Sequence, residues 1–183
     1  MINKILFATT NKGKIKEARE ILGIEIEPVE MKLDEIQTLD SIECVEKKAE
    51  TAYALIKKTI LVEDTILSFH GLNGLPGVFI DYFMKTLGNE GLLRILETSP
   101  TREAIAKTSL CYYDGIRKIT VSGESNGKIS DKIRGDKGFG WDSIFIPEGK
   151  SETFAELSDE EKNKISMRKI ALDKLRNQLL LLN

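Results

Sequence analysis

The sequence predicts an α/β fold built as one domain. Short apolar runs that suit buried strands, such as Lys4–Thr9 and Ile24–Val29, alternate with stretches of helical spacing, such as Lys14–Leu22. With 183 residues, 41% of them hydrophobic and 31% charged, the chain has the composition of an ordinary soluble globular protein with a substantial core. We therefore expect a single domain over residues 1–183.

Composition narrows the chemistry that this chain can perform. His70 is the only histidine, so zinc sites built on several histidines are excluded, and Cys44 and Cys111 form no CxxC motif, which argues against a thiol metal site. No apolar run approaches the length of a membrane span, and a net charge of -2 gives no general attraction to nucleic acid. We expect a cytoplasmic protein with no membrane or nucleic-acid partner, in which carboxylates, lysines and a metal ion carry the chemistry.

The first strand runs into a helix start that suits an anion. Thr9-Thr10-Asn11 ends the strand, and the helix over Lys14–Leu22 follows, with Gly23 as its stop. Backbone N–H groups and the helix dipole favour negative charge at such a point, and nearby lysines add to this. Capping residues and lysines occur on many helices, so this segment alone is a weak signal.

Three acidic residues in the next segments are candidates for a metal site. A long helix is expected from Asp40, with Lys47 and Lys48 on its solvated side. A strand over Thr59–Val62 is expected to deliver Glu63-Asp64-Thr65 at its end, with Ile66–Phe69 continuing extended before the turn-rich stretch Gly71–Gly77. An unpaired buried charge is costly, so Glu35, Glu63 and Asp64 should meet solvent, a basic partner or Mg²⁺.

The second half predicts two helices, a hairpin and a final helix. Gly88 separates the two helices, over Phe79–Leu87 and Glu90–Leu96, and Asp114-Gly115 turns the hairpin between Ala104–Tyr113 and Lys118–Ser122. The glycine-rich stretch 123–138 is expected to be irregular strand and loop. Ser158, with Glu161 three residues on, predicts a capping box that opens the last helix.

The segment Gly138-Phe139-Gly140-Trp141-Asp142 is the most distinctive one in the chain. Glycines beside an aromatic residue let the backbone approach a flat ligand, both rings offer a stacking surface, and Asp142 offers an acceptor to a base edge. A tight turn into a buried strand, with the aromatics in the core, is the competing interpretation. Together with the lysines, the acids and a late helix that carries Arg168, the segment points to a nucleoside polyphosphate ligand.

The sequence resembles the inosine triphosphate pyrophosphatase (ITPase) family over nearly its whole length. Four segments carry the resemblance in the family's order: Thr9-Thr10-Asn11-Lys12-Gly13-Lys14 through Glu17, Val62-Glu63-Asp64-Thr65 with Gly74-Leu75-Pro76-Gly77, the Gly138–Asp142 segment, and Ala155-Glu156-Leu157 through Lys162-Asn163 to Ser166 and Arg168. The resemblance implies an elongated, mixed, twisted sheet, two lobes flanking a central active-site cleft, a homodimer and a requirement for Mg²⁺.

The resemblance also implies roles for individual residues. Substrate contacts are expected from the following residues: Thr9, Asn11, Lys14, Lys47 and Thr65 toward the triphosphate, and Phe139, Gly140, Trp141, Asp142, Lys162, Ser166 and Arg168 toward the base. Glu35 and Asp64 are expected to hold the metal, with Asp64, Glu63 and Lys14 as catalytic residues. Which acid is the metal ligand and which is the base stays open, with Asp64 favoured for the central role.

One position departs from the family's pattern. Met167 stands where the family usually has a histidine between Ser166 and Arg168, so a hydrogen bond to the base edge is missing. We expect the chain to hydrolyse ITP, dITP and XTP to the monophosphate and pyrophosphate. The alternatives are a Maf-like pyrophosphatase of pyrimidine or modified nucleotides, and a nucleotide-binding module with weakened catalysis.

Overall fold

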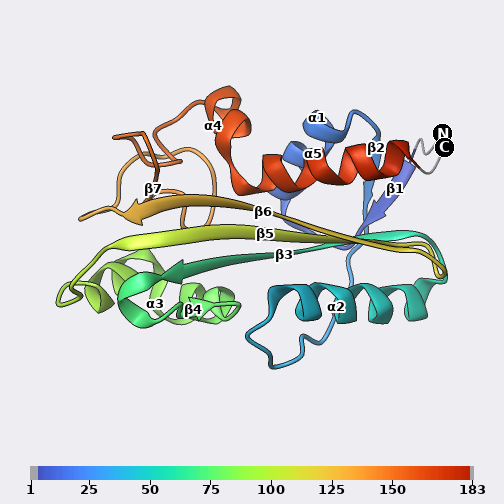
Figure 1. Cartoon of the computed structure of the whole chain (residues 1–183), viewed down its shortest axis with the longest axis horizontal. Helices are drawn as coiled ribbons and strands as arrows, with labels where there is room; N and C mark the ends of the chain where they lie inside the picture. Colours follow the sequence, from blue (N-terminus) through green and yellow to red (C-terminus); the bar gives the residue numbers. More distant parts are fainter. Residues whose placement is uncertain (1–3, 182–183) are drawn as a thin grey trace. The chain divides into compact units, whose positions relative to one another are not determined.

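A computed structural model describes residues 4–181 and contains a mixed β-sheet with helices (Figure 1). Strands follow the order β2-β1-β3-β5-β6-β7, and β4 pairs with β3. The pair β1–β2 and the pair β1–β3 are parallel, whereas β3–β4 and β6–β7 are antiparallel. The elements are β1 (Lys4–Phe7), α1 (Lys12–Leu22), β2 (Glu25–Pro28), α2 (Ser41–Ile56), β3 (Ile60–Phe69), a 3₁₀ turn η1 (His70–Leu72), β4 (Pro76–Gly77), α3 (Ile80–Ile95), β5 (Glu103–Tyr113), β6 (Lys118–Ile129), β7 (Phe145–Pro147), α4 (Asp159–Ile165) and α5 (Met167–Leu180). The predicted α/β class is confirmed.

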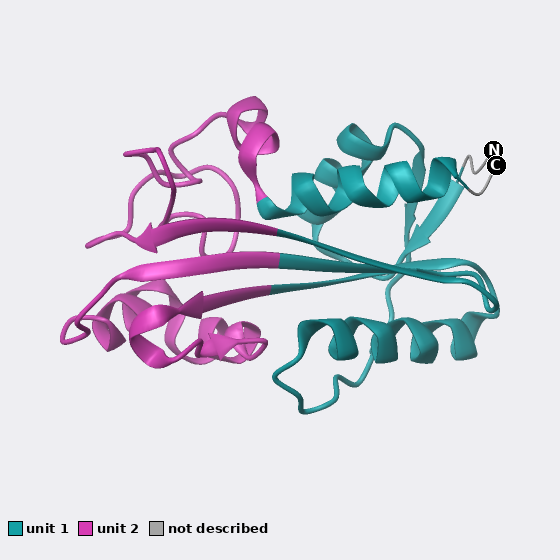
Figure 2. Cartoon of the chain, viewed as in Figure 1, with its two compact units in different colours: residues 1–65, 108–123, 167–183 teal, residues 66–107, 124–166 magenta. Residues whose placement is uncertain are grey.

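The chain divides into two compact units (Figure 2). Unit 1 comprises residues 1–65, 108–123 and 167–183, and unit 2 comprises residues 66–107 and 124–166. Each of the long strands β3, β5 and β6 contributes residues to both units.

Unit 1 has two apolar clusters on its part of the sheet. One cluster joins β1 and β2 to α1 and α5, and includes Leu61 of β3. The other joins α2 to Ile60 and Val62 of β3 and Cys111 of β5. Successive side chains of a strand point to opposite faces of its sheet, so β3 sends alternate residues to α1 and α5 on one side and to α2 on the other (Figure 1).

Unit 2 contains α3, β4, β7 and α4. Helix α3 is kinked at Gly88, whose φ of 63° and ψ of -174° lie outside the helical region, so the predicted break between two helices is confirmed. The predicted capping box at α4 is also present, because the Ser158 side chain accepts from the Glu161 N–H and the Glu161 carboxylate accepts from the Ser158 N–H.

Three boundaries differ from the sequence-based expectation. Strand β3 runs unbroken through Glu63, Asp64 and Thr65 into the extended stretch expected over Ile66–Phe69, since Arg168 pairs with Glu63 and Lys48 Nζ lies 3.7 Å from Asp64 Oδ1. Strand β6 continues to Ile129, because its glycines allow close backbone approach: a Cβ on Gly123 would lie 2.2 Å from the Met167 carbonyl oxygen. The last helix is two helices, since Ser166 has an extended conformation between α4 and α5.

Candidate functional site

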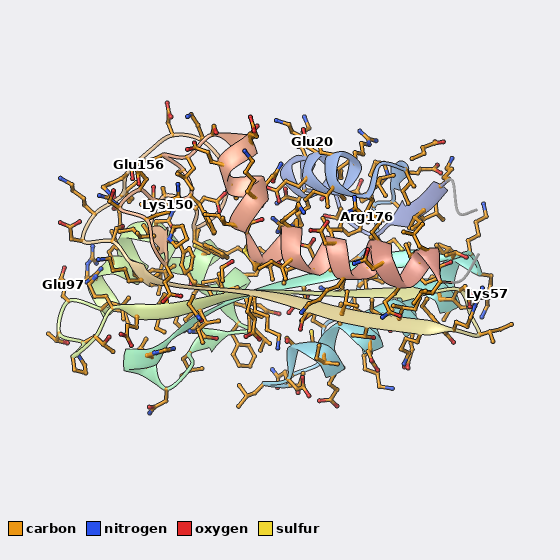
Figure 3. The ribbon with its side chains drawn as sticks, turned by 45° about the horizontal axis from the view of Figure 1, so that its top comes forward. Glu20, Lys57, Glu97, Lys150, Glu156 and Arg176 are labelled. Atoms are coloured by element: carbon orange, nitrogen blue, oxygen red, sulfur yellow. The ribbon has the colours of Figure 1, made fainter. Side chains whose placement is uncertain are left out.

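Among residues 4–181, six charged side chains are buried, whereas the other charges mostly face solvent. Exposed examples are Glu20 on α1 and Lys150 after β7 (Figure 3). Burial of a charge is tolerated when partners compensate it, so the buried ones mark places where the fold holds polar chemistry. They are Glu17, Glu63, Asp64 and Arg168 in unit 1, and Asp142 and Lys162 in unit 2.

Adjacent positions in the middle of β3 send Glu63 and Asp64 to opposite faces of the sheet. Glu63 follows Leu61 toward α1 and α5, and Asp64 follows Val62 toward α2. The two carboxylates therefore have separate sets of partners, which divide the predicted catalytic acids into two clusters.

The Glu63 cluster is centred on Arg168, whose residue is 1% exposed. Arg168 Nε lies 3.0 Å from Glu63 Oε2, and Arg168 Nη2 lies 2.9 Å from Glu63 Oε1. Arg168 Nη1 lies 2.6 Å from Glu17 Oε2, and Lys14 Nζ lies 3.2 Å from Glu63 Oε1. Thr65 Oγ1 donates a 2.9 Å hydrogen bond to Glu63 Oε1. This cluster engages both oxygens of Glu63.

Electrostatics hold Glu63 in its ionised form. Burial alone would raise the pKa of Glu63, but the charges of Arg168 and Lys14 and the hydrogen bonds from Arg168 and Thr65 outweigh burial and lower the pKa to about 2. Burial alone would lower the pKa of Arg168, yet Glu63 and Glu17 hold it above the ordinary arginine value. A carboxylate with so low a pKa and two engaged oxygens is a weak base near neutral pH.

Asp64 has the opposite environment. Lys48 Nζ lies 3.7 Å from Asp64 Oδ1 and also pairs with Glu35. Among residues 4–181, no hydrogen-bond partner reaches the buried Asp64 Oδ2. Burial, together with the charges of Glu35 and Glu63, raises the pKa of Asp64 above the ordinary aspartate value, although Lys48 and Lys14 act in the other direction. Asp64 is therefore a stronger base than Glu63 and has an oxygen available to a ligand.

Glu35 and Asp64 could bind a hard cation whose other ligands come from water and substrate. Within the described part of the chain, no group of three or more His, Cys, Asp or Glu side chains is arranged to hold a metal ion. Glu35 and the free oxygen of Asp64 supply two carboxylates, and Mg²⁺ typically binds one or two carboxylates with water and phosphate oxygens. The donor set thus fits a magnesium ion that is bound largely by a substrate.

The structure brings Lys48, and not Lys47, to the acids. Lys47 pairs with Glu50 at 2.8 Å, and its side chain is 57% exposed, whereas the Lys48 side chain is 11% exposed. The charges of Asp64 and Glu35 raise the pKa of Lys48, although burial opposes this. Lys48 lies in phase with the buried Cys44 and Ala52 of α2, a helical signal that our assignment to the solvated side overlooked.

Asn11 caps α1 in the predicted position. Its side-chain oxygen accepts from the N–H groups of Gly13 and Lys14, and the Asn11 N–H donates to Thr9 Oγ1 at 3.2 Å. Two of the N–H groups expected to hold an anion are thus engaged by the cap. Lys14, half-buried and paired with Glu63, is the charged group of this helix start that belongs to the Glu63 cluster.

The aromatic segment in unit 2 is organised around Asp142. Asp142 Oδ2 accepts from the Phe139 N–H at 2.8 Å and pairs with Lys162 Nζ at 2.7 Å. Lys162 Nζ also lies 4.7 Å from the centre of the Phe139 ring, a cation–π contact. The carboxylate predicted to face a base edge therefore holds its own loop closed through Oδ2.

The two rings of this segment differ in exposure. Trp141 is buried and meets the Phe145 ring edge-on at 5.6 Å, which is the core position of the competing interpretation. Phe139 is half-buried, and Gly140 is exposed with a φ of 64°. Ser166 is fully buried at the end of α4, where its N–H donates to the Lys162 carbonyl. Of the two rings, Phe139 is the one that solvent reaches.

Three residues of these clusters escaped the sequence-based search. Lys48 and Glu17 are charged residues in phase with buried positions of amphipathic helices, which is a usable signal. Asn89, next to the kink of α3, bonds to the aromatic segment, and no sequence pattern indicated that contact. Helical periodicity can predict that a charged residue lies on a buried face, but it cannot predict a contact between residues far apart in the sequence.

Comparison with known proteins identifies the family to which this chain belongs. The model of the Ham1 family matches residues 5–178. A dITP/XTP pyrophosphatase of Methanopyrus kandleri is 43% identical over 176 residues, which cover 93% of each chain. Inosine triphosphate pyrophosphatase 2 of Trypanosoma cruzi is 41% identical over 174 residues, covering 93% of this chain and 89% of the relative.

Solved structures agree with the sequence comparisons. A HAM1 protein from Coxiella burnetii has a TM-score of 0.85 at 27% identity and covers 98% of this chain and 99% of its own. A nucleoside-triphosphatase / dITP/XTP pyrophosphatase from Mycobacterium abscessus has a TM-score of 0.73 at 28% identity, with 94% and 98% covered. The described fold is therefore one that these proteins share over nearly their whole length.

Proposed function

Since this chain belongs to the Ham1 family and its relatives are pyrophosphatases, it is a nucleoside triphosphate pyrophosphatase, and we propose that its substrates are the non-standard purine nucleotides ITP, dITP and XTP. The products would be the nucleoside monophosphate and pyrophosphate. The observation that carries the proposal is the buried Asp64 carboxylate, with an unpartnered oxygen and a raised pKa, beside Lys48 and Glu35.

Asp64 is our proposed base. Hydrolysis between the α- and β-phosphates needs a carboxylate that orients or deprotonates the attacking water, and a base is most effective when its pKa lies nearer the working pH. Asp64 meets this requirement better than Glu63, whose pKa of about 2 and engaged oxygens favour a supporting role. The sequence left open which acid is the metal ligand and which is the base. We propose that Asp64 serves as both base and metal ligand, and that Glu63 holds Arg168 and Lys14 in position.

Charge neutralisation is the other requirement. Negative charge builds up on the α-phosphate oxygens and on the departing pyrophosphate, and fixed cations stabilise it. Lys14 and Lys48 are the proposed cations of unit 1, with Thr9, Asn11 and Thr65 as hydrogen-bonding groups around the phosphates. Mg²⁺, when bound by Glu35 and Asp64, would add positive charge at the phosphates.

We assign base recognition to unit 2. We propose that Phe139 and the exposed backbone at Gly140 receive the base, and that Trp141, Asp142, Lys162 and Ser166 hold them in place. Arg168, although predicted at the base, has its guanidinium engaged by Glu63 and Glu17, so its proposed influence on the base is indirect. Met167 is buried and supplies packing.

A product assay tests the proposed reaction. Purified protein with Mg²⁺ is expected to convert ITP and XTP to monophosphate and pyrophosphate, and to act on ATP, GTP and dTTP at least about 10-fold less efficiently, since a polar base site rejects mismatched groups. Chromatography of the nucleotide and a pyrophosphate assay provide the readout. Orthophosphate in place of pyrophosphate, or preference for dTTP as a Maf-like enzyme would show, would contradict the proposal. Binding without turnover would favour the weakened binding module.

A matched pair of lysine variants tests which lysine of α2 acts. Lys48→Met is expected to lower kcat/KM for ITP by about 10²-fold, because it removes a half-buried cation beside Asp64 and Glu35. Lys47→Met, on the same helix but exposed, is expected to change kcat/KM less than 2-fold. Steady-state kinetics over a range of Mg²⁺ concentrations distinguish them. The reverse order of effects would restore the sequence-based assignment of Lys47.

Two further expectations concern assembly and location: the first rests on the family resemblance and the second on the composition. We propose a homodimer, which sedimentation or light scattering would test, and a cytoplasmic location. Within residues 4–181 no helix has the length and apolar character needed to cross a bilayer.

A further inference from the structure

Asn89 makes the contact from α3 to the aromatic segment of unit 2, directly after the Gly88 kink. Its side-chain Nδ2 lies 3.0 Å from the Gly140 carbonyl oxygen and 3.0 Å from Ser143 Oγ. These bonds join positions 51 and 54 residues apart in the sequence. We propose that Asn89 is a positioning residue that sets base specificity by fixing the orientation of the peptide between Gly140 and Trp141.

The neighbouring carbonyls of the segment are held from within. The Phe139 carbonyl accepts from the Asp142 N–H at 3.3 Å, and the Trp141 carbonyl accepts from the Ile144 N–H at 3.0 Å. The Gly140 carbonyl between them instead receives its hydrogen bond from Asn89, on a different element. The position of this carbonyl thus depends on α3.

Gly140 has little else to restrain it. It has a φ of 64°, and a Cβ built on it would meet no atom within 4 Å, so open space surrounds that side of its backbone. Glycine is also the residue with the widest range of backbone conformations. A hydrogen bond to its carbonyl therefore restricts this peptide more than it would at a packed position.

The peptide unit is planar, so fixing one end fixes the other. In a trans peptide the N–H of Trp141 points away from the Gly140 carbonyl, and Asn89 therefore sets the direction of both groups. Base edges differ in where they carry donors and acceptors, and a misdirected backbone group discriminates between them poorly. This step rests on the proposed function, in which the exposed backbone at Gly140 receives the base.

The second end of the Asn89 amide supports a dedicated role. Among the described residues, the buried Asn89 Oδ1 has no hydrogen-bond partner, whereas Nδ2 donates to both the Gly140 carbonyl and Ser143 Oγ. A buried amide oxygen without a partner carries a desolvation cost. Asn89 is therefore held in an orientation that leaves Oδ1 unsatisfied while Nδ2 makes both hydrogen bonds to the segment.

An isosteric variant tests the inference. Asn89→Asp has the same shape but turns a carboxylate oxygen toward the Gly140 carbonyl, so that an attraction becomes a repulsion. We expect KM for ITP to rise about 10-fold and the preference for ITP over GTP to fall about 5-fold, with kcat changed less than 3-fold. Ser143→Ala, which leaves the Gly140 bond intact, is expected to change KM less than 3-fold. The exposed neighbour variant Glu90→Gln is the control and should match the wild type.

The same experiment separates this inference from the proposed function. Trp141 is the only tryptophan, so its fluorescence reports ITP binding and the state of the segment without depending on turnover. Wild-type turnover of ITP, with unchanged KM and unchanged selectivity in a folded Asn89→Asp variant, would overturn the role of Asn89 alone. An equal loss for all nucleotides, accompanied by a lower melting temperature, would also overturn it. A wild type that neither binds nor hydrolyses ITP would overturn both proposals.

Discussion

Asp64→Asn is expected to lower kcat for ITP by about 10³-fold while the protein stays folded. General-base catalysis contributes about 10²–10⁴-fold, and Asn has no lone pair basic enough to replace the carboxylate. Burial raises the pKa of Asp64, so its charge opposes folding near pH 7, and the melting temperature of the variant should equal or exceed that of the wild type. Steady-state kinetics and thermal unfolding of the same preparation provide the test.

Glu63→Gln is the matched control for the neighbouring position of β3. It removes a carboxylate that Arg168 and Lys14 stabilise, so its main effect should be a loss of stability. An Asp64→Asn variant that keeps more than a tenth of wild-type kcat, beside an inactive Glu63→Gln variant of full stability, would reverse our assignment of the base.

Local signals in the sequence predicted the elements well. Asp40 caps α2, Ser158 and Glu161 form the capping box of α4, and Gly88 interrupts α3, all as expected from nearest-neighbour chemistry. Each of these depends on a hydrogen bond or a dihedral angle within a few residues. Such features are decided before tertiary packing and can therefore be predicted from the sequence alone.

Partner choice was harder to predict than element type. We expected Glu63 and Asp64 together at the end of a strand, facing solvent, a basic partner or a metal, because a buried unpaired charge is costly. The strand continues because Arg168, 105 residues away, compensates Glu63, while Lys48 faces Asp64. Alternation along β3 then sends the acids to different faces. Charge compensation over such a separation follows from the tertiary fold, which local patterns do not contain.

The helical spacing of Lys48 and Arg168 places both residues on the buried faces of their helices, although their charge suggests a position in solvent. Lys48 repeats with Cys44 and Ala52, and Arg168 repeats with Leu172 and Leu175. A charged residue in phase with an apolar stripe either extends its head group to solvent or meets a buried counter-charge. Both residues meet a counter-charge here: Lys48 meets Glu35 and Asp64, and Arg168 meets Glu63 and Glu17. All of these acids except Glu17 were candidates for metal binding.

Arg168→Met is expected to lower the free energy of unfolding by about 3–5 kcal/mol at pH 7, because it leaves Glu63 and Glu17 buried without their main cation. Urea unfolding followed by circular dichroism provides the measurement. The control is Arg176→Met on the same helix, where the side chain is 49% exposed, and its loss should stay below about 1 kcal/mol. Equal losses in the two variants would contradict a stabilising role for the cluster.

The pH dependence of unfolding distinguishes this cluster from simple packing. The pKa of Glu63 is lowered from 4.5 to about 2 in the folded protein, so its contribution is complete above pH 4.5 and is lost as the pH falls toward 2. The wild type should therefore lose about 3 kcal/mol across that window from this group. In Arg168→Met the pKa of Glu63 loses the contributions of Arg168 and rises, so protonation at low pH should relieve the buried charge and narrow the difference from the wild type. The double variant Arg168→Met/Glu63→Gln should be more stable at pH 7 than Arg168→Met alone, because it removes the uncompensated charge together with its partner.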